Sequence, residues 1–147
     1  MLLDATNLAI IRLLKDGRMP FRQIAEKLHL AENTVRARVR RLTQAGVLTV
    51  TGLVDPESIP DTQMVMIGVK IENMNLVGKA EEFSRLKGVI SVSVVTGKFD
   101  LILMVMLKKP FGLLEFYTQE AATIKQIRSV ETFIIYKSFN LKVPLVD

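Results

Sequence analysis

The sequence predicts an α+β protein with an N-terminal winged helix-turn-helix domain and a C-terminal ferredoxin-like βαββαβ domain. Apolar residues recur at helical spacing through the first third of the chain, and alternation with a period of two dominates from Met64 onward. Between these regions, residues 55–63 contain two prolines, two aspartates and no periodicity. We therefore expect a helical domain over 1–54, a linker over 55–63 and a βαββαβ domain over 64–147.

The positive charge is confined to the predicted helical domain. Residues 1–54 contain nine Lys or Arg and four Asp or Glu, whereas residues 55–147 contain eleven of each. This asymmetry indicates a nucleic-acid-binding head on a neutral body. The chain has no cysteine, which excludes disulfides, thiol chemistry and cysteine-ligated zinc, and its single histidine, His29, is expected to be a solvent-facing turn residue. No metal ion or cofactor is predicted.

Three helices are expected in the first domain. Residues 4–15 form the first, which Asp4 or Thr6 caps and Gly17 ends. Residues 21–28 and 32–45 form the second and third, joined by a turn over 29–31, and Gly46 takes the left-handed conformation at the last C-terminus. The predicted core of this head is apolar throughout: Leu8, Ile11, Leu14, Ile24, Leu28, Leu30, Val35, Val39 and Leu42.

The third helix is predicted to read double-stranded DNA. It has four arginines in six residues, and its apolar Val35, Val39 and Leu42 fall on the opposite side. Arginine can bind guanine bidentately, and asparagine or glutamine can bind adenine in the major groove. The alternative is a solvated helix face, but Glu32 is the only acid between Lys27 and Gly46. The predicted DNA-binding residues face outward: Asn33, Thr34, Arg36, Ala37, Arg40, Arg41 and Gln44.

One arginine of this helix has a different predicted role. Arg38 leans toward the side of the helix that docks on the protein. We expect it to be structural and to pair with Asp4 or Glu26.

The remaining elements are expected to be mainly strands. Residues 47–54 are rich in β-branched side chains and predict a strand or a short wing. The order that follows is βαββαβ, with four antiparallel strands and both helices on one face. The predicted strands are 64–73, 89–96, 99–107 and 130–139, and the predicted helices are 76–86 and 111–123.

The predicted sheet is apolar on both faces, which indicates a homodimer. Two helices can cover only one face, and soluble monomers rarely expose a large apolar patch. A second subunit that packs sheet against sheet removes the patch, and a two-fold dimer presents two reading helices to two half-sites. The predicted dimer interface consists of large apolar side chains of the uncovered face: Met64, Met66, Ile102, Met104 and Met106.

The first third of the chain contains a series of short motifs: Leu3-Asp4, Ile10/Ile11-x-x-Leu14, Asp16-Gly17-Arg18, Ile24-Ala25-x-x-Leu28, Thr34-Val35-x-x-Arg38-Val39-x-Arg41-Leu42 and Ala45-Gly46-Val47-Leu48. With these motifs it resembles the opening domain of the Lrp/AsnC family of feast/famine transcription regulators. One departure is Ala31, because the family usually has a serine at the start of the reading helix, and a missing N-cap side chain costs roughly 1 kcal/mol. The resemblance implies a DNA-binding transcription regulator.

The second half of the chain resembles the regulatory domain of the same family. The segment 95–101, Val-Thr-Gly-Lys-Phe-Asp-Leu, is similar to the family's T-G-x-x-D turn, and residues 129–132 are similar to its V-x-x-T stretch. The resemblance implies dimers that often assemble into octamers, and an amino acid bound near that turn. The residues that it implies for the effector are Gly97, Lys98, Asp100 and Thr132.

The residues of the turn allow two readings of their own. Asp100 can accept an ammonium group while turn amides near Gly97 hold a carboxylate. Alternatively, Gly97-Lys98 is only a tight hairpin and Asp100 satisfies nearby backbone amides.

The sequence is compatible with three functions. The first is a sequence-specific regulator that responds to a small molecule. The second is an enzyme like the siroheme decarboxylases, which resemble these regulators in build and use histidine and arginine in their pocket. Residues 55–147 contain no histidine, only two arginines and no nucleophile–base set, so no catalytic residue is predicted. The third is an architectural DNA-binding protein without an effector. No membrane span or signal peptide is evident, so we expect a cytoplasmic protein.

Overall fold

The computed structural model describes residues 3–145, which form two compact units with their boundary between Thr51 and Gly52. This boundary corrects the predicted linker over 55–63, because that segment belongs to the second unit. Its polar residues make local contacts: Asp55 caps a 3₁₀ helix, η1 (Pro56–Ser58), and the Thr62 hydroxyl donates to the Pro56 carbonyl at 2.9 Å. Residues that resembled a flexible loop therefore shape the start of the sheet domain.

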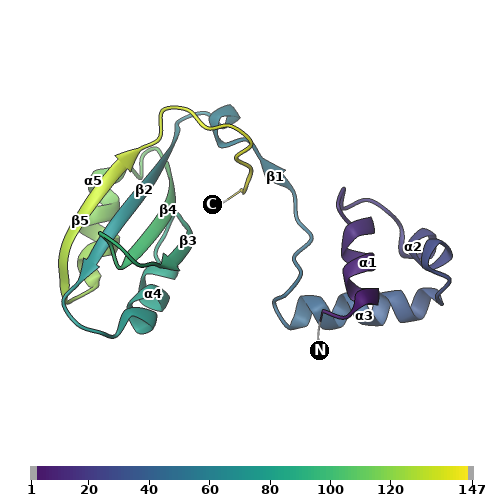
Figure 1. The fold of residues 1–147 in the computed structure, drawn as a ribbon. Coiled ribbons are helices and arrows are strands. Elements are labelled where there is room, and N and C mark those ends of the chain that lie inside the picture. The colour runs from purple at the N-terminus through teal and green to yellow at the C-terminus, as the bar shows by residue number, and fades with distance from the viewer. Residues whose placement is uncertain (1–2, 146–147) are drawn as a thin grey trace. The chain divides into compact units, whose positions relative to one another are not determined.

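The first unit is a three-helix head made of α1 (Ala5–Leu13), α2 (Phe21–Leu28) and α3 (Glu32–Gln44), drawn in Figure 1. The bounds of α2 agree with the prediction, and α3 is one residue shorter. The left-handed Gly46 (φ 67°) follows α3 as expected. The core of the unit joins all three helices through Ile10, Leu14, Ile24, Ala25, Val35 and Val39, and Leu42 is fully buried as well.

The inward face of α1 differs from the prediction. Ile10 is completely buried, whereas the predicted core residue Leu8 is 41% exposed and Ile11 is only half-buried. Apolar side chains surround most of α1, so its periodicity does not define one face. The polar Asn7, which is 6% exposed, points inward instead and fixes the rotation of the helix.

The wing predicted over 47–54 is largely absent. Only β1 (Leu53–Val54) is a strand, and its partner is β6 (Val143–Pro144), which the sequence did not predict. A β-rich stretch becomes a strand only where a neighbouring strand supplies hydrogen bonds. Residues 47–50 form no strand, whereas β1 obtains a partner within the second unit.

The second unit contains a four-stranded antiparallel sheet in the order β3-β4-β2-β5 (Figure 1). Its strands are β2 (Thr62–Ile71), β3 (Val89–Val94), β4 (Leu101–Lys108) and β5 (Ile127–Ile134). Helix α4 (Leu76–Ser84) connects β2 to β3, and a helical segment over 113–123 connects β4 to β5. This is the predicted βαββαβ order, with β5 beginning and ending earlier than expected.

The helical segment after β4 is irregular. It starts as α5 (Leu113–Glu115), continues as a π-helical stretch, η2 (Phe116–Glu120), and ends as a 3₁₀ turn, η3 (Ala121–Thr123). Leu113, Phe116, Tyr117 and Ala121 pack against the core of the sheet unit, and Phe116 is fully buried. Leu114 is 70% exposed, so the inward face starts at Leu113 and not, as expected for a face through Tyr117 and Ala121, at Leu114.

The two faces of the sheet are covered differently. The helix-covered face holds the main core, where alternate residues of β2 and β4 pack with Phe83 and Phe116. On the other face, Met64 and Met106 pack with Val143 of β6, and both are under 7% exposed. The C-terminal segment therefore already covers one end of the face that was predicted to be open.

Candidate nucleic-acid interface and effector turn

Helix α3 presents its predicted reading residues to solvent. Asn33, Thr34, Arg36, Ala37, Arg40, Arg41 and Gln44 are all exposed. Val35, Val39 and Leu42 on the opposite side are buried against the head. This arrangement lets the helix dock on the protein by one face and approach DNA with the other.

Arg38 anchors α3 to the start of α1. It donates through Nη1 to Asp4 Oδ2 at 2.7 Å and to Asn7 Oδ1 at 3.0 Å. Asp4 also caps α1, since its Oδ1 accepts from the Asn7 amide at 2.7 Å. The hydrogen bond from Arg38 and that from the Asn7 amide lower the pKa of Asp4. Of the two predicted partners of Arg38, Asp4 is confirmed, and Glu26 pairs with Arg22 instead.

The outward arginines differ in how they are held. Arg36 donates through Nη2 to Glu32 Oε1 at 2.8 Å, and its guanidinium carbon lies 5.2 Å from the centre of the Phe21 ring. Arg40 and Arg41 make no side-chain hydrogen bond or ion pair with residues 3–145. The sequence did not single out Phe21 or Glu32 as supports of Arg36, although the spacing of Glu32 and Arg36 is that of a helical ion pair.

The start of α3 lacks a side-chain cap. Ala31 has the extended backbone of an N-cap residue, φ −72° and ψ 144°, but offers no acceptor. Glu32 in the first turn supplies a negative charge near the positive end of the helix. In the preceding turn, His29 is exposed as predicted and takes the left-handed conformation that ends α2.

The turn between β3 and β4 places Asp100 against the end of β2. Asp100 Oδ2 accepts from the Ile71 amide at 2.8 Å, and Oδ1 accepts from Lys70 Nζ at 3.2 Å. The Ile71 amide lowers the pKa of Asp100, and the Lys70 ammonium acts in the same direction. Within this chain, Asp100 therefore satisfies a backbone amide, as the structural alternative supposed. Gly97 has φ 115°, a conformation that favours glycine.

The other two predicted effector residues make contacts on opposite faces of the sheet at β5. Lys98 Nζ lies 2.6 Å from Glu131 Oε2, on the face away from the helices. Thr132, the next residue of β5, points toward the helical layer and forms a hydrogen bond with the Tyr117 hydroxyl. The structure thus groups Gly97, Lys98 and Asp100 and separates Thr132 from them, because neighbouring residues of a strand face opposite ways.

Phe99 connects this turn to the uncovered face of the sheet. Its ring lies directly over Gly68 of β2, where a Cβ atom would come within 2.6 Å of the ring. The Phe99 ring also packs edge-on against Phe133, with ring centres 6.1 Å apart. The Lys98 ammonium lies 5.1 Å from the centre of the Phe99 ring. Alternation in the sequence identified neither this contact nor the need for glycine at position 68.

The predicted dimer-interface residues all lie on the uncovered face. The register pairs Met64 with Met106, Met66 with Met104, and Gly68 with Ile102. Met66, Ile102 and Met104 are half-buried, and Phe133 beside them is 43% exposed. Met64 and Met106 are buried within the chain, so the free apolar part of this face is narrower than the alternation indicated.

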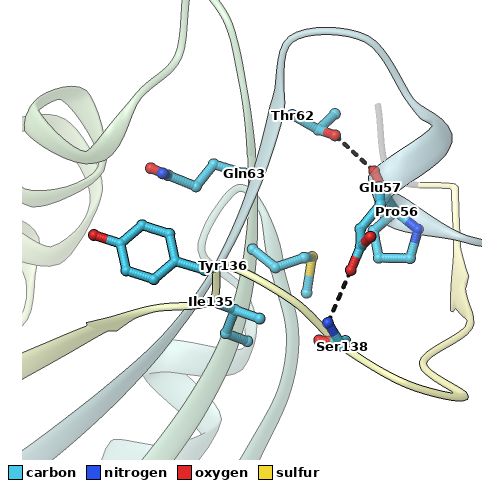
Figure 2. Close-up of a pocket in the computed structure, with 8 residues that line it drawn as sticks. Pro56, Glu57, Thr62, Gln63, Ile135, Tyr136 and Ser138 are labelled. Atoms are coloured by element: carbon cyan, nitrogen blue, oxygen red, sulfur yellow. Dashed lines mark hydrogen bonds between the residues drawn. The ribbon is translucent and has the colours of Figure 1, made fainter.

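A cavity of about 320 Å³ lies at the start of β2, and the Asp100 turn lies at the end of that strand. Figure 2 shows two hydrogen bonds in its wall, one from the Ser138 amide to Glu57 and one from Thr62 to the Pro56 carbonyl. Lys137 also pairs with Glu57 at 2.6 Å, and this contact lowers the pKa of that carboxyl. The cavity is lined by Pro56, Glu57, Thr62, Gln63, Met64, Ile135, Tyr136 and Ser138.

Within residues 3–145, none of the helices has the length and hydropathy of a transmembrane span. No group of three or more histidine, cysteine, aspartate or glutamate side chains is placed to hold a metal ion there.

Comparison with known proteins gives the same two-part division. The AsnC-type helix-turn-helix domain matches residues 3–43, and the Lrp/AsnC ligand-binding domain matches residues 64–144. An uncharacterised HTH-type transcriptional regulator of Pyrococcus abyssi is 34% identical over 135 residues, which cover 90% of this chain and 85% of the relative.

Solved structures share the fold. The structure of E. coli AsnC has a TM-score of 0.69 at 22% identity and covers 94% of this chain and 95% of its own. A Neisseria meningitidis transcriptional regulator in complex with L-Met has a TM-score of 0.71 at 20% identity, covering 97% of this chain and 96% of its own. With both domains matched along most of its length, this chain belongs to the Lrp/AsnC family of DNA-binding transcriptional regulators that carry a ligand-binding domain.

Proposed function

We propose that this protein is a sequence-specific transcription regulator whose DNA binding responds to an amino acid. The observation that carries the proposal is the two-sided character of α3. Its buried side fixes the helix to the head, and its outward side offers arginine, asparagine and glutamine at the spacing of a reading helix. The net charge of +5 comes from the domain that contains this helix.

The working form in this proposal is a homodimer, and dimers assemble further into an octamer. Met66, Ile102, Met104 and Phe133 form a partly exposed apolar surface on the face without helices. A second copy that packs against this surface removes it from water. The dimer then presents two reading helices to the two halves of an operator.

The proposed effector site is the turn that contains Gly97, Lys98 and Asp100. An amino acid carries one ammonium and one carboxylate. The turn offers a partner for each, the carboxylate of Asp100 and the ammonium of Lys98. The ammonium of the ligand would replace Lys70 at Asp100, and Lys98 with the exposed amides near Gly97 would hold the carboxylate. The L-Met bound to the Neisseria relative supports an amino acid as the class of ligand. The proposed site leaves out Thr132, whose side chain lies on the other face of β5 in a hydrogen bond with Tyr117.

Footprinting on the DNA upstream of the protein's own gene tests both parts of the proposal. We expect protection with the spacing of a helical turn, and a change in the protected region when one amino acid of a pool is added. The variant Lys98→Ala should keep the protection and lose the response. DNA binding that no amino acid changes would contradict the sensor and favour an architectural protein.

The same experiment separates the regulator from an enzyme. Absence of protection at low salt, where basic proteins bind DNA most readily, would overturn the regulator. A titration with siroheme would then test the decarboxylase-like alternative. The single histidine of the chain, His29, lies in the head, so the sheet domain has no histidine for such a pocket.

A further inference from the structure

We propose that Arg36 makes the base-specific contact of the reading helix, with Phe21 and Glu32 as its positioning residues, and that Arg40 and Arg41 neutralise phosphates. This inference rests on the DNA-binding role and assigns different tasks within it. It follows from a difference among three exposed arginines of α3. Arg36 contacts Glu32 of the same helix and Phe21 of α2, whereas Arg40 and Arg41 have no partner within residues 3–145.

Two contacts restrain the guanidinium group of Arg36. Glu32, one turn earlier on α3, accepts from Nη2 at 2.8 Å, and the Phe21 ring at the start of α2 lies 5.2 Å from the guanidinium carbon. The two contacts come from different helices of one compact unit, so the side chain cannot swing freely. Its side chain is still 50% exposed, and its other N–H groups make no hydrogen bond within residues 3–145.

A held guanidinium suits a base rather than a phosphate. Two parallel hydrogen bonds to guanine O6 and N7 require a planar donor in a fixed orientation. Ordering the side chain before DNA arrives reduces the entropy that binding must otherwise cost. Arg36 also lies in the first half of α3, and the N-terminal residues of such a helix reach base edges.

The charge balance around Arg36 supports the same division. Glu32 offsets the positive charge of Arg36, so this pair adds little to the attraction between the head and the DNA backbone. Arg40 and Arg41, in the second half of α3, keep their full charge. Flexible, unpaired arginines can follow phosphates of any sequence, which is the sequence-independent part of binding.

The test begins with a binding site selected from random DNA by the full-length protein. Affinities for the selected duplex and for a random duplex are then measured at several salt concentrations. Phe21→Leu keeps every charge and most of the apolar volume but removes the aromatic face. We expect a two- to fivefold loss on the selected duplex, no change on random DNA and an unchanged salt dependence. Phe21→Tyr, which keeps the ring, should bind like the parent.

A matched control separates this effect from a loss of folding. Leu28→Val also removes apolar volume that packs on the core of the head, but this residue lies at the opposite end of α2 from Phe21. It should leave the ratio of selected to random affinity unchanged. If Leu28→Val lowers that ratio as much as Phe21→Leu does, general loosening explains the result and the inference fails.

Removing the acid Glu32 and removing an arginine should change DNA affinity in opposite directions. Glu32→Ala frees Arg36 and removes a negative charge, so binding to random DNA should tighten while the preference for the selected site falls. Arg36→Ala should remove the preference for guanine at one position, with a roughly ten- to hundredfold loss on the selected duplex. Arg41→Ala should weaken both duplexes equally and reduce the salt slope by about one.

Two results would overturn the inference and can be told apart. Equal losses of Arg36→Ala on selected and random DNA would make Arg36 a phosphate contact, while the protein remains a DNA-binding regulator. Failure of the parent protein to bind any duplex at low salt would instead overturn the proposed function itself.

Discussion

At the scale of single residues, Asp4 serves two helices at once. One carboxylate oxygen caps α1 through the Asn7 amide, and the other accepts from Arg38 of α3. Asn7 completes the set, since its side-chain oxygen also accepts from Arg38 while the residue is buried. These contacts set how the reading helix is held against the first helix.

Substitutions of Asp4 should separate its two roles. Asp4→Asn keeps an acceptor for the helix cap but loses the charge that attracts Arg38, whereas Asp4→Ala loses both. We expect the melting temperature of the helical head to fall in the order parent, Asp4→Asn, Asp4→Ala, as followed by circular dichroism. Asp16→Asn, an acid in an exposed turn, is the control. Equal melting of the parent and Asp4→Ala would show that the network does not stabilise the head.

The lowered pKa of Asp4 adds a dependence on pH. Because the carboxylate form is favoured in the folded state, its stabilising effect is present above the unfolded pKa and is lost as the pH falls through the folded value. The parent should therefore lose its advantage over Asp4→Asn as the pH falls below about 4. Thermal melts of both proteins between pH 6 and pH 2 would measure this; a difference that does not change with pH would contradict it.

At the scale of single elements, α3 begins without a capping side chain. Ala31 has the backbone of an N-cap residue, and its exposed side chain leaves room for a hydroxyl group. Ala31→Ser should stabilise the head by about 0.5–1 kcal/mol, because the serine oxygen can accept from a free amide of the first turn. Urea denaturation would measure the gain. Ala45→Ser at the other end of α3 should give none, and a gain equal to that of Ala31→Ser would argue against capping.

The sheet depends on the absence of a side chain at Gly68. A Cβ atom there would lie within 2.6 Å of the Phe99 ring, so Gly68→Ala must push the ring off the sheet. We expect a loss of about 1–3 kcal/mol in the free energy of unfolding, measured by urea denaturation. In a protein that already carries Phe99→Ala, Gly68→Ala should cause little further loss in the free energy of unfolding. If the two losses simply add, the contact between Gly68 and Phe99 is not the cause.

Within single elements, the sequence predicts helix bounds best where residues that start or stop a helix stand at both ends. Helices α2 and α3 were located within one residue because proline, a left-handed turn and Gly46 mark their ends. The segment over 113–123 follows Pro110 and Gly112, but its apolar spacing is compatible with more than one inward face, and the structure buries Phe116 and exposes Leu114. Its change from α-helical to π-helical winding at Phe116 leaves no local pattern in the sequence.

At the scale of the whole molecule, the uncovered sheet face predicts the state of assembly. Met104 lies at its centre, paired with Met66, and is half-buried. Met104→Glu would place a charge in a surface that a second copy should bury, so we expect dissociation of the dimer in sedimentation experiments. Val77→Glu, on the exposed side of α4, is a matched control that should sediment like the parent. A Met104→Glu protein that also sediments like the parent would exclude this interface.

The long-range contacts are what the sequence could not predict. Alternation placed Met64 and Met106 on the correct face but did not show that Val143 covers them. The β-rich segment 47–54 looked like a wing because its partner, β6, lies some ninety residues away and includes a proline. Likewise, the family motif grouped Thr132 with Asp100, although the faces of β5 and the Tyr117 hydroxyl separate them. Such pairings join distant segments and leave no local pattern.

The pairing of β1 with β6 also has a consequence for protein engineering. Leu53 lies opposite Pro144, so the chain enters and leaves the sheet unit on neighbouring strands about 5 Å apart. A circular permutation that moves the helical head from before β1 to after β6 would shift its point of attachment by only that strand spacing. The sheet unit can therefore be fused to a DNA-binding head either before β1 or after β6, which makes it a scaffold for hybrid regulators.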